Sequence, residues 1–257
     1  MRTNHIKAAL ARGETVFGAW LSLPSVFTTR LIARHGFDWL MVDMEHGPID
    51  FTIMAQMVGV IADSGGPAPF VRVPSNSVEN IKRVLDSGAW GVLVPMVNSR
   101  AEAEAVVMAS KYPPQGGRSL GGPFGPLGFG TTRPAYAEKA NDEIMVCIQI
   151  ESAEAVENCE EIISTPGIDV AFIGPNDLSA SLGLVPSSEN SDPVFIKAVD
   201  RIKEAATRHN VPLGMFSTNG EAARIRAQEG FRFISAITDA GALETGLRAN
   251  LDTARNK

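Results

Sequence analysis

The chain has 257 residues, of which 44% are hydrophobic and 20% charged, and its formal net charge is −6. This composition supplies a large core and excludes a disordered protein, while the acidic balance without a basic run argues against a nucleic-acid partner. The sequence shows no long apolar segment or signal-like N-terminus, and Cys147 and Cys159 form no CxxC motif, so we expect a cytoplasmic protein without a membrane partner.

Eight short apolar runs follow one another along the chain. They are VFGAWLS (16–22), FDWLMVDM (37–44), APFVRV (68–73), GVLVPMV (91–97), IMVCIQI (144–150), IDVAFIG (168–174), VPLGMF (211–216) and FRFISAI (231–237). Amphipathic stretches such as SVENIKRVLDSG, SRAEAEAVVMASKY and SAEAVENCEEIIS separate them, and Ser or Asp caps and Gly ends indicate helices. Apolar strands that alternate with helices are typical of a parallel sheet. Eight such units without a linker favour a single-domain (β/α)8 TIM barrel over residues 1–257, a fold of about 250 residues, rather than two doubly wound domains.

Polar residues gather where the predicted strands end. In a barrel of parallel strands, these ends surround the catalytic mouth. The polar rim consists of Trp20, then Asp43, Glu45 and His46, then Arg72, then Gln149 and Glu151, and finally Gly174, Asn176 and Asp177. The seventh and eighth runs end in Met215, Phe216 and Ile237, so we expect the chemistry on one side of the mouth.

Glu151 and Asp177 end neighbouring predicted strands and can point at one centre. Two adjacent carboxylates repel each other, and hard divalent cations are held by one or two carboxylates plus water and substrate oxygens. The pair therefore predicts a site for Mg²⁺, Mn²⁺ or Co²⁺. The alternative is that each acid only caps the helix that follows it.

Arg72 and His46 are the candidate catalytic cations. Arg72 lies among apolar residues in FVRVP, where an unpaired guanidinium is costly, so it binds either a substrate oxygen or a rim carboxylate. His46 follows two acids, and an imidazole oriented by a carboxylate is the usual general base; the alternative is a structural histidine. All seven lysines fall in tails, helices or loops, which argues against a Schiff base and favours a metal electrophile.

The motifs GAWLSLPS, VDMEHGPID, VRVP, VPMV, IQIES and FIGPNDLSASLG together resemble the HpcH/HpaI aldolase family. These are metal-dependent class II pyruvate aldolases, typified by 4-hydroxy-2-oxoheptanedioate aldolase, and the resemblance spans about residues 18–236. It implies a (β/α)8 barrel, usually a hexamer or otherwise a trimer, in which the last helix is exchanged between subunits.

The resemblance also implies roles for individual residues. Those that match catalytic positions are Glu151 and Asp177 as metal ligands, Arg72 on the substrate carbonyl, Gln149 beside the metal shell, and His46 as the base, with Asp43 and Asp86 as supporting acids. Those that match the pyruvate carboxylate site are the backbone amides of Gly174, Asn176 and Asp177. Trp20, at the rim, is expected to contact the substrate.

The implied reaction is cleavage of a 4-hydroxy-2-oxo acid to pyruvate and an aldehyde through a metal-stabilised pyruvate enolate. The segment SLGGPFGPLGFG departs from the bacterial pattern and is closer to macrophomate synthase, which leaves the second substrate open. An oxaloacetate decarboxylase or macrophomate synthase-like enzyme, a CoA-ester lyase and a non-catalytic binder of 2-oxo acids are the alternatives.

The glycine-rich loop Pro113–Gly130 is long for a connection between a helix and a strand, where roughly 2 to 6 residues are usual. Barrel topology places it at the N-terminal face, away from its own mouth. Its apolar residues predict that it reaches a neighbouring subunit, with Arg118 or Phe124 near that subunit's substrate and metal. The alternative is a surface loop packed on its own barrel.

Overall fold

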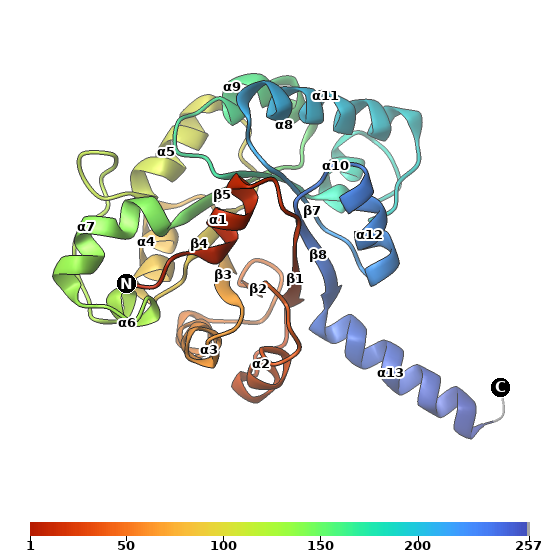
Figure 1. Ribbon diagram of the computed structural model, residues 1–257. Helices are drawn as coiled ribbons and strands as arrows, with labels where there is room; N and C mark the ends of the chain where they lie inside the picture. The colour runs from red at the N-terminus through yellow and green to blue at the C-terminus, as the bar shows by residue number, and fades with distance from the viewer. Residues whose placement is uncertain (256–257) are drawn as a thin grey trace.

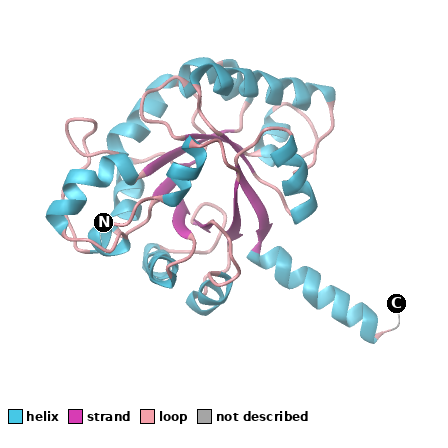
Figure 2. Cartoon of the chain, in the orientation of Figure 1, coloured by secondary structure: helices cyan, strands magenta, loops and turns pink. Residues whose placement is uncertain are grey.

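The computed structural model describes residues 1–255. Eight parallel strands form a closed barrel in chain order, and pairing of the first with the eighth completes it. The strands are β1 (Val16–Leu21), β2 (Trp39–Asp43), β3 (Ala68–Arg72), β4 (Gly91–Val94), β5 (Met145–Ile150), β6 (Val170–Ile173), β7 (Leu213–Met215) and β8 (Phe233–Thr238). They lie at the centre with helices outside (Figures 1 and 2). The predicted TIM barrel is confirmed, and every predicted strand is present to within three residues at each end.

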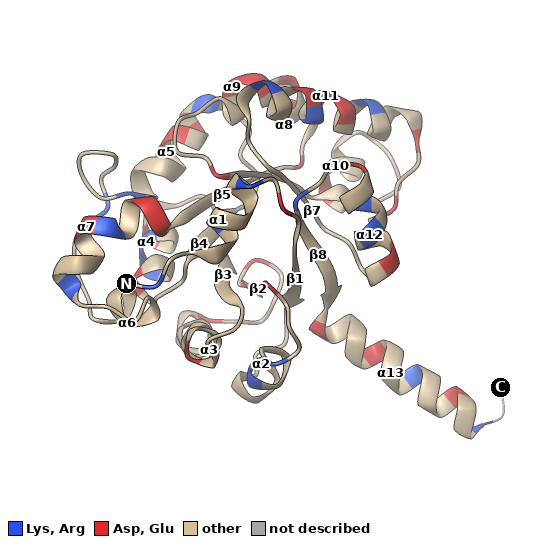
Figure 3. Ribbon diagram, viewed as in Figure 1, with Lys and Arg blue, Asp and Glu red and all other residues tan. Residues whose placement is uncertain are grey.

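The helices that cover the barrel mostly begin at side-chain caps. Ser25, Ser77, Ser99 and Ser152 each accept a hydrogen bond from a backbone N–H of the first helical turn, which satisfies a donor that has no partner inside the helix. The helices are α1 (His5–Ala11), α2 (Val26–Ile32), α3 (Phe51–Ser64), α4 (Val78–Asp86), α5 (Arg100–Ser110), α6 (Phe124–Gly128), α7 (Arg133–Glu143), α8 (Ala153–Glu157), α9 (Cys159–Ile163), α10 (Pro175–Ser181), α11 (Pro193–His209), α12 (Gly220–Gln228) and α13 (Asp239–Ala254). Most Lys, Arg, Asp and Glu lie on these outer elements (Figure 3). Within residues 1–255, none of these helices has the length and apolar character needed to cross a bilayer.

Aromatic rings fill the inside of the barrel below the mouth. The rings of Trp39 and Phe233 stack with centroids 4.2 Å apart, and Phe70 and Phe172 pack against Phe233. A side chain at Gly18 would overlap the Trp39 ring, so the glycine makes room for the indole. This packing closes the barrel interior, and the free space is therefore at the carboxyl ends of the strands.

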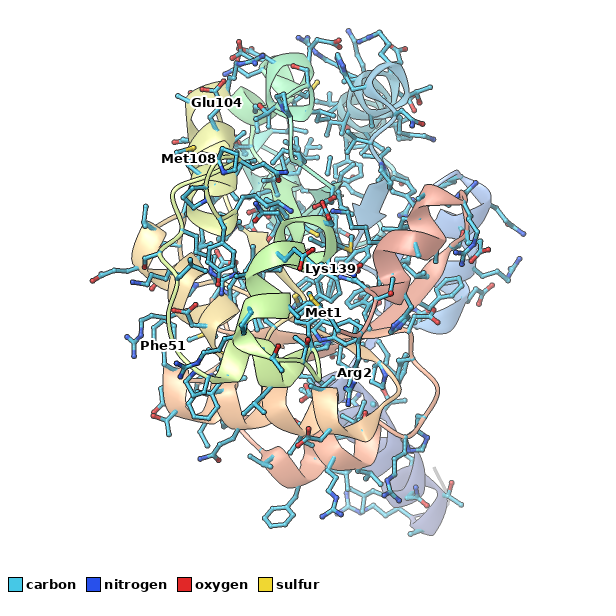
Figure 4. All side chains as sticks on the ribbon, turned by 60° about the vertical axis from the view of Figure 1, so that its left-hand side comes forward. Met1, Arg2, Phe51, Glu104, Met108 and Lys139 are labelled. Atoms are coloured by element: carbon cyan, nitrogen blue, oxygen red, sulfur yellow. The ribbon has the colours of Figure 1, made fainter. Side chains whose placement is uncertain are left out.

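The N-terminal segment is hydrogen-bonded to the end of the barrel where the strands begin, opposite the mouth. The backbone N–H of Arg2 donates to the carbonyl of Phe129 at 2.8 Å, and the Asn4 amide donates to the carbonyls of Trp90 and Glu143, just before β4 and β5. Figure 4 shows Met1 and Arg2 beside α7, the helix that carries Lys139. These contacts fix α1 at the N-terminal face, away from the mouth.

Helix α13 does not pack along the barrel. It leaves β8 and projects into solvent (Figure 1), so that Leu243, Leu247 and Leu251 are exposed at helical spacing. On α2, Phe27 and Leu31 are also exposed, at 84% and 64%. Apolar faces of this extent usually mark an interface.

Candidate active site

A cavity of about 320 Å³ opens at the carboxyl ends of the strands. The rim residues predicted from the sequence that line it are Trp20, Asp43, His46, Arg72, Gln149, Gly174, Asn176 and Asp177. Ser22, Phe172, Pro175, Phe216 and Thr238 complete its wall. The side chains come from strands far apart in the sequence, so the barrel topology brings the predicted residues together.

Two carboxylates hold Arg72 in this cavity. Its Nε and Nη2 donate to the two oxygens of Asp43 at 2.9 and 2.7 Å, and its Nη1 lies 2.9 Å from Glu45 Oε2. The guanidinium also lies 5.0 Å from the centre of the Trp20 ring, whose Nε1 donates to Asp43. Burial favours the protonated form of Asp43, but the Arg72 and Trp20 bonds outweigh it and keep its pKa below the usual value. Arg72 is therefore ion-paired with rim carboxylates and also lines the cavity. The sequence offered a carboxylate partner and a substrate-binding position as alternatives, and the geometry allows both.

The turn after β2 exposes His46. Asp43 Oδ1 accepts the backbone N–H groups of Glu45 and His46 at 3.1 and 3.4 Å, and a side chain at Gly47 would overlap the Asp43 carbonyl oxygen. The His46 side chain is 64% exposed, and its Nε2 lies 3.9 Å from Glu45 Oε2. Both Asp43 oxygens are engaged by Arg72, Trp20 and the turn, so Asp43 supports His46 through its backbone rather than through its ring. Among the described acids, Glu45 is the one that comes within 4 Å of a His46 ring nitrogen.

Glu151 is buried at the end of β5 and held by two donors. Its Oε1 accepts the backbone N–H of Met96 at 2.9 Å, and its Oε2 accepts the Gln149 side-chain amide at 2.5 Å. A side chain at Gly174 would overlap Oε2, so the glycine keeps the carboxylate accessible. Burial, with the negative charges of Glu45 and Asp177, raises the pKa of Glu151 to about 8.

These features fit a cation. Glu151 and Asp177 face the same region from neighbouring strands, and Gln149 Oε1 is buried without a hydrogen-bond partner among the described residues. Residues 1–255 contain no group of three or more His, Cys, Asp or Glu side chains that forms a ready metal cage. Two carboxylates completed by water and substrate oxygens are the usual ligand set of a hard divalent ion.

A family model described as HpcH/HpaI aldolase/citrate lyase matches residues 17–244. The chain belongs to this family. A hydroxypyruvate/pyruvate aldolase of Rhizorhabdus wittichii is 35% identical over 252 residues, which cover 98% of this chain and 99% of that protein. The solved structure of a family protein from Burkholderia cenocepacia has a TM-score of 0.89 and 35% identity, over 98% of this chain and 100% of that one. Macrophomate synthase has a TM-score of 0.87 and 26% identity, over 98% of this chain and 88% of that one. The resemblance stated from the motifs is confirmed.

In this HpcH/HpaI family member, Arg118 does not line the cavity of its own chain. Its side chain is 0% exposed, donates to Asp86 at 2.8 Å and lies over the Tyr112 ring at 4.6 Å. These contacts hold Arg118 within its own chain, which favours Phe124 over Arg118 as the residue that reaches another chain's metal. Asp86 is likewise paired with Arg118 and does not line the cavity with His46.

The glycine-rich loop is divided between two environments. Phe129 is buried and stacks on Trp90 with ring centroids 5.0 Å apart, so part of the loop packs on its own barrel. Leu120, Phe124 and Leu127 remain exposed. That these exposed residues contact a neighbouring subunit remains a prediction.

Several residues of the family member's cavity were not assigned to it from the sequence. They are Ser22, Phe172, Phe216 and Thr238. Thr238 lies one residue beyond the predicted end of the eighth run, and Phe172 was part of an apolar strand. Only the alternation of side chains along β6 could have indicated that Phe172 points inward.

Proposed function

We propose that this family member is a metal-dependent class II pyruvate aldolase, a carbon–carbon lyase that splits a 4-hydroxy-2-oxo acid into pyruvate and an aldehyde. The observation that carries the proposal is that Arg72, Asp177 and the exposed His46 line one cavity. The buried Glu151 lies close enough to Asp177 and Arg72 for their charges to act on its pKa. The hydroxypyruvate/pyruvate aldolase relative supports a pyruvate unit as one product.

Glu151 and Asp177 would hold the divalent cation, Mg²⁺, Mn²⁺ or Co²⁺, with Gln149 beside it. When bound, the ion supplies Lewis-acid polarisation of the substrate carbonyl. The backbone N–H groups of Asn176 and Asp177, in the first turn of α10, and that of Gly174 would bind the carboxylate of the 2-oxo acid, whereas Pro175 has no N–H to offer.

Arg72 donates to the C2 oxygen, where negative charge develops as the C3–C4 bond breaks. Because Asp43 and Glu45 already fix the guanidinium, it needs no reorganisation during the reaction, and donors fixed in advance in this way are the most effective. Trp20 packs against the same guanidinium and forms one wall of the substrate site. His46 takes the proton from the C4 hydroxyl in cleavage and returns it in condensation.

The decisive experiment measures exchange of the pyruvate methyl protons in D₂O with Mn²⁺ present. Exchange requires formation of the enolate but no aldehyde. It therefore reports the contribution of Arg72, Glu151 and Asp177 to enolate formation, separately from cleavage of the C3–C4 bond. Arg72→Ala should abolish exchange, whereas Arg83→Ala, which removes an arginine that lies over Phe51, should leave it unchanged. Full exchange and cleavage after exhaustive chelation, or exchange in the Arg72 variant, would contradict the proposal.

Decarboxylation of oxaloacetate is the second candidate. It is favoured by the likeness to macrophomate synthase across 98% of this chain, and it needs the same enolate. Turnover of oxaloacetate measured beside that of a 4-hydroxy-2-oxo acid separates the two reactions.

We also propose a homo-oligomer, a hexamer or a trimer, in which α13 packs on another subunit. The exposed leucines of α13 and the exposed Phe27 and Leu31 of α2 support this arrangement. Phe124, with the partly exposed Asp86, would then contribute to the mouth of a neighbouring subunit. Arg118 holds Asp86 away from the His46 of its own chain. If Asp86 supports a histidine, it is therefore the His46 of a neighbouring subunit.

A further inference from the structure

The side of the mouth opposite the acid pair carries two hydroxyl groups. In the closed barrel, β1 lies across from β5 and β8 across from β4, so Ser22, after β1, and Thr238, at the end of β8, face the site from the side away from Glu151. Both line the cavity. The strand register pairs Trp20 with Thr238, which places the two hydroxyl-bearing ends side by side. A pyruvate unit held at β5 and β6 leaves this side for the second substrate.

The Ser22 hydroxyl is oriented by a buried carboxylate. Its Oγ donates to Asp239 Oδ1 at 3.0 Å, and Asp239 also accepts the backbone N–H groups of Ser22, Leu23 and Ala240 at 2.9, 3.0 and 2.8 Å. Since the hydroxyl hydrogen is used in this bond, Ser22 offers only its lone pairs to the cavity. It is an acceptor.

Thr238 has the opposite character. Its Oγ1 accepts the backbone N–H of Gly241 at 2.9 Å as the cap of α13. Within residues 1–255 the hydroxyl hydrogen has no protein acceptor, so it is free to donate to a molecule in the cavity. Gly241 permits this approach, because a side chain there would lie 2.8 Å from Thr238 Oγ1.

An acceptor beside a donor matches an alcohol group, which both donates and accepts. An alkyl group would leave the lone pairs of Ser22 and the hydroxyl hydrogen of Thr238 unpaired in a desolvated site, which is unfavourable. A carboxylate would satisfy Thr238 but repel the lone pairs of Ser22, and the arginine of the cavity, Arg72, is already held by Asp43 and Glu45.

We propose that Ser22 and Thr238 select a short, uncharged aldehyde that carries a hydroxyl group. This inference rests on the proposed aldolase function and names its second substrate class. The aromatic rings of Trp20, Phe172 and Phe216 line the same cavity as Ser22 and Thr238, which favours a short aldehyde.

The test compares kcat/KM for condensation of pyruvate with glycolaldehyde and with propanal, which differ by a hydroxyl in place of a methyl group. The wild type should prefer glycolaldehyde over both propanal and succinic semialdehyde. Ser22→Ala and Thr238→Val should each lower the ratio of glycolaldehyde to propanal by roughly three- to tenfold. Thr238→Ser keeps the hydroxyl and the cap and should restore the ratio, and Ser64→Ala, at the far end of α3, should leave it unchanged.

The two proposals fail in different ways. If the wild type shows no exchange of pyruvate methyl protons, the aldolase function itself is wrong. If exchange is present but the wild type prefers propanal or succinic semialdehyde, or the Ser22 and Thr238 variants keep the wild-type ratio, the selection of a hydroxylated aldehyde is wrong. Measuring a ratio in each variant removes any general effect of the substitution on folding or concentration of active sites.

Discussion

Asp43 joins three parts of the mouth through one carboxylate. It binds the guanidinium of Arg72, the indole N–H of Trp20 and the backbone of the turn that exposes His46. The position of the arginine therefore depends on an acid that need not touch the substrate.

Substitution of Asp43 by Asn should destabilise the protein. The amide keeps one acceptor oxygen but presents N–H groups to the guanidinium, and breaking a buried ion pair typically costs about 3 kcal/mol or more. For a domain of this size that corresponds to a fall in Tm of roughly 6 to 12 °C, measurable by thermal unfolding. Asp50→Asn is the matched control, because Asp50 caps α3 and Asn caps equally well. Equal melting temperatures for Asp43→Asn and the wild type would show that the pair contributes little.

Because Lys111 is buried, we expect the free energy of unfolding to rise at alkaline pH. Burial lowers its pKa from 10.5 to about 8, and its Nζ donates to the carbonyls of Asn141 and Ile144 at 2.7 Å. Between these two pH values the unfolded chain binds more protons than the folded one, so the free energy of unfolding increases as pH rises from 8 to 10.5. The gain is at most about 3 kcal/mol.

The measurement is denaturant unfolding of the wild type and Lys111→Met from pH 7 to 10.5. Methionine removes the titrating group, so the difference between the two proteins should be constant below pH 8 and grow in favour of the wild type above it. Parallel curves over the whole range would exclude a depressed lysine pKa.

At the scale of elements, the loop between β4 and α5 supports the acid pair. Met96 has φ 53°, in the left-handed region that favours glycine, and its N–H donates to Glu151. The backbone conformation, not the side chain, makes this bond.

A pair of variants separates the backbone from the side chain. Met96→Gly and Met96→Ala both remove the thioether and keep the N–H, but only glycine relieves the positive φ. We expect the glycine variant to be the more stable by about 1 kcal/mol, measured by urea unfolding. An alanine variant of equal or greater stability would show that the left-handed conformation carries no strain.

The sequence predicted elements better than partners. Eight apolar runs and their caps were sufficient for the barrel. The rule that strand ends surround the mouth placed Arg72, Gln149 and Asp177 there, and all three line one cavity. The choice of partner was less predictable, because a carboxylate can satisfy whichever donor the tertiary packing brings near. Asp43 therefore binds Arg72 rather than the His46 ring, and Asp86 binds Arg118. The segment SAEAVENCEEIIS also divides at Asn158 into α8 and α9, and its pattern showed no break.

At the scale of the whole molecule, α13 projects from the barrel instead of packing in the layer of helices around it. Leu247→Lys with Leu251→Lys should lower the mass of the assembly measured by light scattering, because two charges would enter the proposed interface. Ala249→Lys, on the opposite face of the same exposed helix, adds charge away from these leucines and should leave the mass unchanged. A monomeric wild type, or a double variant with the wild-type mass, would refute exchange of α13.

The seam between β1 and β8 determines when the chain can finish folding during synthesis. The first strand made must pair with the last, and the paired residues Trp20 and Thr238 are 218 positions apart (238 − 20). At about 5 to 20 residues per second, the ribosome takes tens of seconds to cover this interval. Throughout that time β1 has a free, apolar edge of the kind that other chains can pair with. Aggregation through this edge is therefore a greater risk during synthesis than after the final strand has emerged.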